Sequence, residues 1–432
     1  MARRSRRSLM ALGTLAVCLA GTGALAACGS SSASGSERNG KVSITFMEAM
    51  SSGTLKTSLE HLTQQFEQAN PNIKVNLDAV SDYGTLQTKE TAAIAAGKPP
   101  TIGQAYEDWA ATFANSKAIV PISNFATADD LSHLYDGVKK DLYLPGNQLY
   151  MWPFNKSVVI TYYNQAMLQA KHLTAPTTWD QFATDAKAVA GNGTVGIAID
   201  PGTSSGAGGG ESLFEMIAGS YGTPVFGTDG SPQFNSPAAV QAMQYLVNLK
   251  NAGALAVGTN YPGETDLGAG KGLFDVSSVA SYYYDQQAIG GKFPMGTAAA
   301  PAGPAGRTNA LAGTNIVMFA KASSAEQKAA WTYMKFLSSA SSQAYWAENS
   351  GYLPVTPDAM AQMTDFVAKN PYVKFAADDL SIAVGAPPYS WITKCQGDLA
   401  VAMQSALSGK QTAAAALADA QKQATADKSS SQ

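Results

Sequence analysis

Residues 42–79 read VSITFMEAMSSGTLKTSLEHLTQQFEQANPNIKVNLDA, and this stretch decides the fold class. Residues 42–46 alternate between apolar and polar side chains, which is the period of a half-buried strand. Apolar residues then recur at helical spacing over 55–66, and Asn70-Pro71 stops the helix. A second alternating run over 73–77 predicts another strand. A strand, a helix and a strand in this order predict an α/β layer with a mainly parallel sheet.

The same alternation continues outward along the chain. A helical stretch over 83–96 and a short strand over 101–106 complete a β-α-β-α-β pattern. A strand-like run over 158–163 opens a second region that has its own strands and helices. With 432 residues, against about 100–200 per domain, the chain is long enough for two lobes. We therefore expect two α/β lobes with long internal connections.

We expect the chain to leave lobe I near Asn164 and to return to it near Ala310. We assign 41–163 and 310–432 to lobe I, with some exchange to lobe II near 350–395. Residues 164–309 form the expected lobe II. Residues 294–306 are rich in Ala, Pro and Gly, lack periodicity and are the expected connector between the lobes.

The first 27 residues have the composition of an export signal. A start with four arginines precedes an apolar stretch over 9–20 and small residues up to Ala27. Leu25-Ala26-Ala27-Cys28 matches a bacterial lipoprotein signal, in which the cysteine is lipidated and becomes the new N-terminus. An ordinary signal peptide cleaved nearby is the alternative. Residues 28–40 are rich in Ser and Gly, as in a flexible tether, so we expect a lipid anchor on the extracellular face of the cell membrane.

Charge and cysteine content exclude a nucleic-acid-binding protein and a fold held together by disulfides. Without the four leader arginines, Lys+Arg falls from 29 to 25 against 32 Asp+Glu, so the net charge falls from −3 to −7. No basic cluster remains to bind nucleic acid. Cys18 lies in the leader, so Cys395 has no partner for an intramolecular disulfide and the fold must rest on its core.

The sequence contains no complete catalytic motif, because the order or the spacing of the required residues does not fit. Gly202-Thr203-Ser204-Ser205-Gly206 fits a G-x-S-x-G nucleophile elbow, but that arrangement needs a histidine after the serine, and all three histidines precede it. A ligand-covering loop is the better interpretation. No phosphate-binding or zinc-binding motif is present, so we expect neither a cofactor nor a metal. A secreted carbohydrate-active enzyme acting through carboxylates such as Glu107, or a structural surface lipoprotein, remains the alternative.

Aromatic residues gather at predicted strand ends and loops, where binding residues concentrate. Such rings stack on the flat apolar faces of sugars and polyols, while nearby Asn, Asp, Glu and Ser bind the hydroxyl groups. The groups are Tyr282-Tyr283-Tyr284, Tyr389 with Trp391, Trp152 with Phe154, and Tyr106 with Trp109.

Short motifs distributed along the whole mature chain resemble one family. They are Ala69-Asn70-Pro71, the stretch AAGKPPTI over 95–102, PFNKS over 153–157, Tyr162-Tyr163-Asn164, TTWD over 177–180, and GYLPV over 351–355. The chain resembles the extracellular solute-binding proteins (family 1) that feed bacterial ABC importers, in the class of the maltose- and glycerol-phosphate-binding proteins. Asp82-Tyr83-Gly84 and the stretch over 104–107 are most similar to the glycerol-3-phosphate-binding branch.

The resemblance implies a two-lobed periplasmic-binding-protein fold, class II-like, with a hinge between the lobes and the ligand cleft at their interface. It implies a monomer that is not an enzyme and that delivers a small solute to the membrane subunits of an ABC permease. It also implies a set of ligand contacts, to which the aromatic pattern adds Trp391. The implied contacts are Tyr83, Glu107, Ser157, Ser278 or Ser281, Gly313 and Tyr352.

One departure from the branch bears on the solute. The branch carries an arginine late in the chain beside the ligand phosphate, whereas 388–394 contains none. After Ser36 only Arg38 and Arg307 remain, so the two-pronged clamp for a dianionic phosphate is nearly absent. We expect a neutral carbohydrate or a glycerophosphodiester to bind better than free glycerol-3-phosphate.

Overall fold

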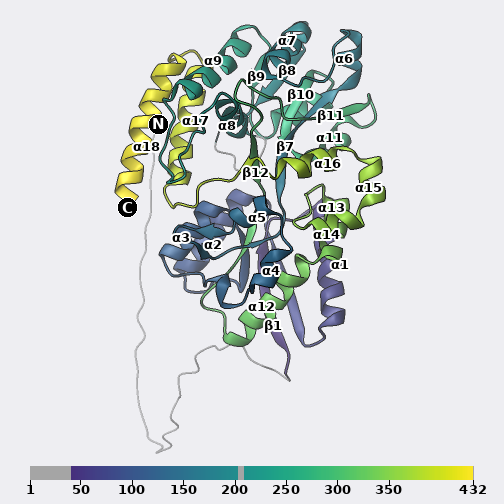
Figure 1. Ribbon diagram of the computed structural model, residues 1–432, viewed down its shortest axis with the longest axis vertical. Helices are drawn as coiled ribbons and strands as arrows, with labels where there is room; N and C mark the ends of the chain where they lie inside the picture. Colours follow the sequence, from purple (N-terminus) through teal and green to yellow (C-terminus); the bar gives the residue numbers. More distant parts are fainter. Residues whose placement is uncertain (1–39, 203–208, 432) are drawn as a thin grey trace, which may run out of the picture. The chain divides into compact units, whose positions relative to one another are not determined.

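Two large β-sheets organise the residues that the computed structural model describes, 40–202 and 209–431 (Figure 1). The first sheet has the order β2-β1-β3-β13-β6. The strand β1 pairs in parallel with β2 and β3, whereas β13 is antiparallel to β3 and β6. The strands are β1 (Val42–Glu48), β2 (Ile73–Ala79), β3 (Ile102–Ala105), β6 (Trp152–Pro153) and β13 (Asn315–Met318). The predicted β-α-β-α-β opening is confirmed.

Helices of the first lobe follow from local sequence signals. The helix α1 (Gly53–Ala69) buries Leu59, Leu62 and Phe66 and ends at Asn70, whose side chain donates to the Phe66 carbonyl at 2.9 Å. The helix α2 (Tyr83–Ala95) begins at Asp82, whose carboxylate accepts from the Thr85 N–H. The other elements are α3 (Glu107–Asn115), η1 (Ile122–Asn124), α4 (Ala128–Ser132), α5 (Asp136–Lys140), β4 (Tyr143–Leu144), β5 (Gln148–Leu149), α12 (Ser324–Leu337), α13 (Ala340–Ser350), α14 (Pro357–Gln362) and α15 (Thr364–Lys369).

The second sheet has the order β14-β12-β7-β10-β8-β9, with β11 also pairing with β7. The strand β7 is antiparallel to β10, β11 and β12, and all but one of its residues are buried. The prediction of a connector over 294–306 is wrong, because this stretch contains β11, which pairs with β7 inside the second sheet. The strands are β7 (Ser157–Asn164), β8 (Val195–Ile199), β9 (Leu255–Val257), β10 (Gly272–Ser278), β11 (Met295–Ala299), β12 (Asn309–Ala312) and β14 (Ala383–Val384).

The second lobe includes the C-terminal helices, which the expected division had assigned with 310–432 to lobe I. The helices α17 (Ile392–Leu407) and α18 (Ala413–Ser431) pack against each other and against α9 (Figure 1). Burial raises the pKa of the Cys395 thiol in α17 to about 12, which keeps it neutral. The other elements are α6 (Gln165–Ala170), α7 (Trp179–Val189), α8 (Gly210–Ser220), α9 (Pro237–Asn251), α10 (Pro262–Gly268), η2 (Val279–Ser281), α11 (Tyr282–Ile289) and α16 (Tyr372–Asp379).

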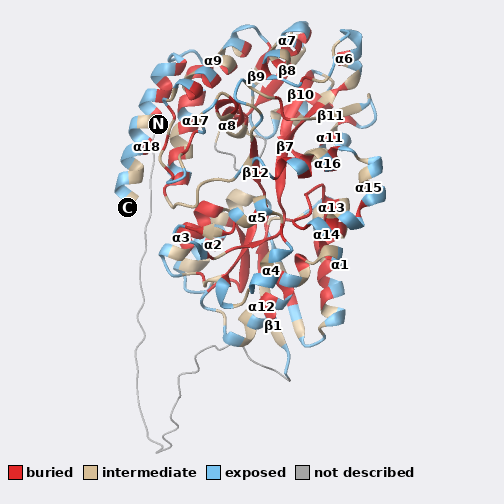
Figure 2. Ribbon diagram, viewed as in Figure 1, coloured by how far each residue is buried: buried red, intermediate tan, exposed pale blue. Residues whose placement is uncertain are grey.

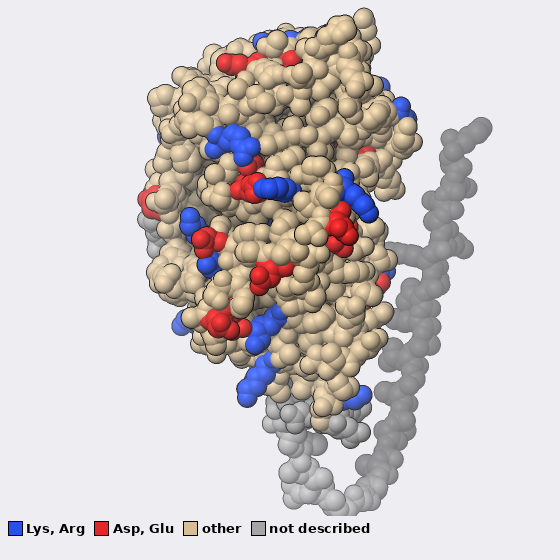
Figure 3. Space-filling model, turned by 45° about the vertical axis from the view of Figure 1, so that its right-hand side comes forward, with Lys and Arg blue, Asp and Glu red and all other residues tan. Residues whose placement is uncertain are grey.

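The buried side chains form two hydrophobic clusters, the first of which extends from the first lobe to residues of β7, η2, α11 and α16. The buried segments in Figure 2 concentrate on the two sheets and the helix faces that cover them. Phe46, Phe66 and Trp346 belong to the first core, and Phe182 and Phe214 to the second. The predicted two-lobed α/β fold is confirmed. No helix in the described part of the chain is long and apolar enough to cross a bilayer. On the face drawn in Figure 3, charged side chains of both signs are scattered over a mostly uncharged surface.

The chain crosses between the sheets three times, and two of the crossings, from β6 to β7 and from β12 to β13, lie next to each other. Gly313, at the second crossing, has a φ of +81°, and a Cβ atom there would lie 1.7 Å from the Asn155 carbonyl oxygen. The Asn155 side chain accepts hydrogen bonds from the Thr314 N–H at 3.2 Å and from its hydroxyl at 2.7 Å. The two crossings are therefore in direct contact.

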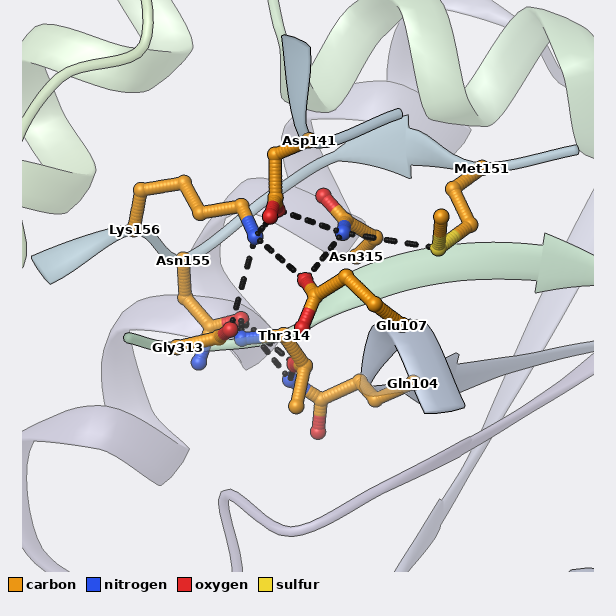
Figure 4. Close-up of polar contacts among 9 residues, drawn as sticks. All are labelled: Gln104, Glu107, Asp141, Met151, Asn155, Lys156, Gly313, Thr314 and Asn315. Atoms are coloured by element: carbon orange, nitrogen blue, oxygen red, sulfur yellow. Dashed lines mark hydrogen bonds and ion pairs between the residues drawn. The ribbon is translucent and has the colours of Figure 1, made fainter. Parts of the chain in front are cut away.

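A fully buried lysine lies at the same crossings (Figure 4). The Lys156 side chain is 0% exposed and donates to the carboxylates of Glu107, at 3.3 Å, and Asp141. It also donates to the Gly313 carbonyl at 3.4 Å. Asn315 of β13 donates to the same Glu107 and Asp141 oxygens, at 3.0 Å each. One ammonium thus ties together both crossings, the start of α3 and the segment after α5.

The carboxyl groups of Glu107 and Asp141 share the single ammonium of Lys156. This sharing affects the protonation of Glu107. Burial raises the pKa of Glu107 well above its usual range, and the Asp141 charge raises it further, outweighing the lowering effect of Lys156. Burial opposes the charged form of Lys156, but the two acids outweigh it and raise the lysine pKa. We infer an ion pair between Lys156 and Asp141 with a protonated Glu107 beside it.

Replacement of Gly313 by alanine should destabilise the protein by about 3 kcal/mol, because a Cβ atom overlaps the Asn155 carbonyl and the backbone is left-handed. Gly291→Ala is the matched control, since Gly291 has a φ of +76° and a Cβ atom there would meet nothing within 4 Å. That control should lose only about 1 kcal/mol. Urea unfolding of both variants measures the difference, and equal losses would contradict the close approach.

Lys156→Met should destabilise the protein by about 3–5 kcal/mol, because it removes the cation from a buried pair of acidic groups. Lys374→Met removes an exposed pair with Asp378, whose side chains are 69% and 62% exposed. This control should change stability by less than about 0.5 kcal/mol. Similar losses of stability for the two variants in urea unfolding would contradict the role of Lys156 in holding the two crossings together.

Candidate functional site

Two neighbouring cavities, of about 460 and 550 Å³, open between the sheets. Glu107 of α3 and Glu215 of α8 line both cavities, so one residue from each lobe faces the same space. Residues of β12 and residues near the start of α17 also line the smaller cavity. Glu107, which the resemblance implied as a ligand contact, therefore has one oxygen in the buried lysine cluster and a place on the cavity wall.

Carboxyl groups dominate the polar wall of the smaller cavity. Asp108 follows Glu107 on α3 and accepts a hydrogen bond from the Thr393 hydroxyl of α17. Glu211 and Glu215 are one turn apart on α8. Burial raises the pKa of Glu215 to about 7, and burial together with the Glu215 charge raises the pKa of Glu211 well above its usual range. Near neutral pH these groups can donate as well as accept hydrogen bonds.

Sequence reasoning missed Glu211 and Glu215, although a signal was present. Their spacing of four residues places both on one face of a helix. What the pattern could not indicate is that this face of the helix lines a cavity.

Tyrosines of the first lobe form a hydrogen-bonded group beside Glu107. The hydroxyls of Tyr83 and Tyr352 lie 2.9 Å apart, and the Asn155 amide donates to the Tyr83 hydroxyl at 2.8 Å. The Tyr106 ring lies 5.4 Å from the Tyr83 ring and 5.0 Å from the Trp109 ring, edge to face in each case. Burial raises the pKa of Tyr352 to about 12, so the phenol stays neutral. Tyr106 and Trp109 line the smaller cavity.

The structure brings some of the sequence-predicted residues together and separates others. Tyr83, Glu107 and Tyr352 meet in the region just described. Ser157 and Gly313 lie at the lobe crossings, where Ser157 pairs with Ala312 across β7 and β12. These five predicted residues therefore surround one part of the molecule.

Of the remaining predicted residues, Ser278 and Ser281 flank Ala280, whose backbone lies close to Gly351, the residue before Tyr352. Ser278 begins η2, where its hydroxyl accepts from the Ala280 N–H at 3.1 Å, and Ser281 ends η2. Trp391 is buried in the second core and donates from its indole to the Gly230 carbonyl at 3.0 Å. Cys28 and Ser204 lie outside the described residues.

This arrangement suits recognition of a hydroxyl-rich solute. Phenols, carboxyl groups and amides provide hydrogen-bond donors and acceptors, and the aromatic rings provide apolar faces. Among the described residues, no group of three or more His, Cys, Asp or Glu side chains is placed to hold a metal ion.

Comparison with known proteins agrees with this geometry. Residues 61–377 match the model of a family described as bacterial extracellular solute-binding proteins. A binding protein of Brucella abortus is 26% identical over 383 residues, covering 85% of this chain and 89% of its own. The sn-glycerol-3-phosphate-binding periplasmic protein UgpB of Yersinia enterocolitica is 26% identical over 358 residues, covering 76% of this chain and 78% of its own.

Solved structures show the same fold. UgpB from Mycobacterium tuberculosis, in complex with glycerophosphocholine, superposes with a TM-score of 0.80 at 21% identity, covering 90% of this chain and 99% of its own. The GacH receptor of Streptomyces glaucescens, solved without ligand and with acarbose, gives 0.77 at 20% identity, covering 88% and 96%. The family match spans most of the chain and the two-lobed fold agrees with it. The chain therefore belongs to the bacterial extracellular solute-binding protein family.

Proposed function

We propose that this protein captures a carbohydrate-type solute, a sugar or a glycerophosphodiester, and delivers it to the membrane subunits of an ABC importer. The observation that carries the proposal is the cavity between the two sheets, whose walls have aromatic side chains from the first lobe and carboxyl groups from both lobes. Similar structures hold glycerophosphocholine and acarbose, which have the same hydroxyl-rich chemistry.

Contact with both lobes provides the mechanism of delivery. Glu107 belongs to the first lobe and Glu215 to the second, so a solute that touches both stabilises the closed arrangement of the lobes. Closure is a population shift, whose size equals the difference in solute affinity between closed and open states. A permease that recognises the closed form would then receive loaded protein in preference to empty protein.

The arginine content bears on which phosphates can bind. Arg307 pairs with Asp379, on the second lobe, and so is already occupied. Arg38 lies outside the described residues. A dianionic phosphate would have to be desolvated without a guanidinium partner, which is unfavourable. A neutral sugar or a singly charged phosphodiester is accommodated more readily than glycerol-3-phosphate.

We further propose that Cys28 carries a lipid anchor on the extracellular face of the cell membrane. The support is the Leu25–Cys28 motif behind an apolar leader, followed by a Ser- and Gly-rich tether. A monomer held in this way stays close to the permease that it serves.

Solute binding should raise the melting temperature and make the protein more compact. Solute at 100 times its dissociation constant adds about 2.7 kcal/mol of stability, because it binds only the folded state. A thermal-shift screen of sugars, polyols and glycerophosphodiesters identifies the solute, and small-angle scattering then measures the radius of gyration. A bound solute that leaves the radius unchanged would contradict lobe closure, and turnover of the solute would support the enzyme alternative.

Cys28→Ala should release the protein from the membrane fraction into the medium, because lipid attachment needs the thiol. Cys395→Ala is the matched control, since that thiol is buried in the second core and should not affect location. Fractionation and immunoblotting give the distribution. Retention of the Cys28 variant at the membrane would disprove the lipidation site.

A further inference from the structure

The larger of the two cavities, of about 550 Å³, has walls that are mainly apolar. It is lined by residues of α5 and by Asp141 from the first lobe, by residues of α8, β12 and 224–228 from the second, and by residues 381–388. The large apolar side chains on the wall are Met216, Val225, Phe226, Leu311, Ile382 and Val384. Ligand pockets commonly have this volume and this kind of wall. The recognition of hydroxyl groups described above gives this space no occupant.

Several polar groups on the same wall already have partners within the protein. The Asn309 amide donates to the Val159 carbonyl at 2.8 Å, and the Thr308 hydroxyl donates to the Met216 carbonyl at 2.8 Å. The Asp141 carboxylate is held by the buried lysine described above. Groups that are used in this way contribute little to the binding of a further hydroxyl. The larger cavity therefore suits an apolar group better than a sugar or polyol hydroxyl.

Two of the apolar wall residues are also open to solvent. Ile382 is 36% exposed and Val384 is 65% exposed. Val384 belongs to β14, which lies at the edge of the second sheet and pairs with β12. Exposed apolar side chains on an edge strand favour unwanted association, and apolar surface beside a cavity is typical of a binding site. A molecule that enters the cavity would cover both side chains.

The larger cavity adjoins the smaller one, whose polar wall is suited to hydroxyl groups. Glu107, Glu215, Leu311, Val384 and Gln396 line both cavities. A solute bound in the smaller cavity therefore reaches the residues at which the two spaces meet. A substituent on that solute would continue into the apolar space without leaving the protein.

We propose that the larger cavity binds an apolar substituent of the solute, so that the solute has a hydroxyl-rich part joined to an alkyl or aryl group. The inference rests on the proposed function and narrows it, because a free sugar or polyol leaves the larger cavity unfilled. Burial of one methylene strengthens binding up to about four-fold, so a short chain is enough to select such a solute.

A series of substituted sugars and polyols tests this inference with the wild-type protein. The probes are glucose, maltose and glycerol, each free and as its methyl, butyl and hexyl derivative, and calorimetric titration gives the affinities. Affinity should rise about two- to four-fold per methylene until the cavity is filled. The 2-methoxyethyl derivative is the matched control, because it has the length of the butyl derivative but contains an ether oxygen. It should bind less tightly than the butyl derivative.

A pair of variants places the substituent in the larger cavity. Ile382 lines that cavity and not the smaller one, so Ile382→Asn should weaken the hexyl derivative about five-fold and leave the free sugar or polyol unchanged. Val257→Asn is the matched control, since Val257 is 44% exposed on β9, at the opposite edge of the same sheet, and lines neither cavity. It should change neither affinity. Equal effects of the two variants on the hexyl derivative would overturn the assignment of this cavity.

The results for the wild type distinguish this inference from the proposed function. Affinity that stays constant or falls along the alkyl series would contradict only the inference, and a free sugar or polyol that binds would leave the proposed function standing. Affinity that rises equally for the butyl and 2-methoxyethyl derivatives would also overturn the inference, because the gain would then come from length and not from apolar surface. Binding of no member of the three series would contradict both.

Discussion

Burial of the Lys156 ammonium imposes the constraint on which the arrangement of the lobes depends. A lysine with no solvent contact must be paired, and its partners come from α3, from the segment after α5 and from the Gly313 carbonyl. The buried charge therefore fixes the path of two of the segments that connect the sheets, from β6 to β7 and from β12 to β13. It also positions Glu107, which shares the ammonium with Asp141 and lines both cavities. The same contacts that join the lobes thus place a carboxyl group where a solute can reach it.

The candidate site combines groups of different origin around that carboxyl. Tyr83, Tyr106 and Tyr352 contribute hydroxyls and ring faces from the first lobe, and Glu211 and Glu215 contribute carboxyl groups from the second. Burial raises the pKa of the phenols and of the carboxyl groups, which keeps the phenols neutral and holds protons on carboxyl groups near neutral pH. A surface with few formal charges and many hydrogen-bonding groups fits a hydroxyl-rich solute better than an ion.

Local sequence patterns predicted the β-α-β-α-β opening correctly, because alternation and helical spacing report which face of an element is buried. They could not assign β7 or α17 to a lobe, since an apolar strand or helix face specifies burial but not its partner. The small residues of β11 concealed a strand. For the site, motif resemblance selected Tyr83, Glu107 and Tyr352, which the structure brings together, and its ligand roles for them stay predictions.

The order of strands in the first sheet has a consequence for how the chain folds. The strand β13 lies between β3 and β6, yet it follows them in sequence only after the whole of β7 to β12. Until it arrives, β3 has an unpaired edge, and pairings of such long sequence separation form slowly. The first lobe therefore cannot complete its sheet until strands β7 to β12 of the second lobe have been synthesised. Folding of the first lobe is expected to be a late event that follows synthesis of most of the second.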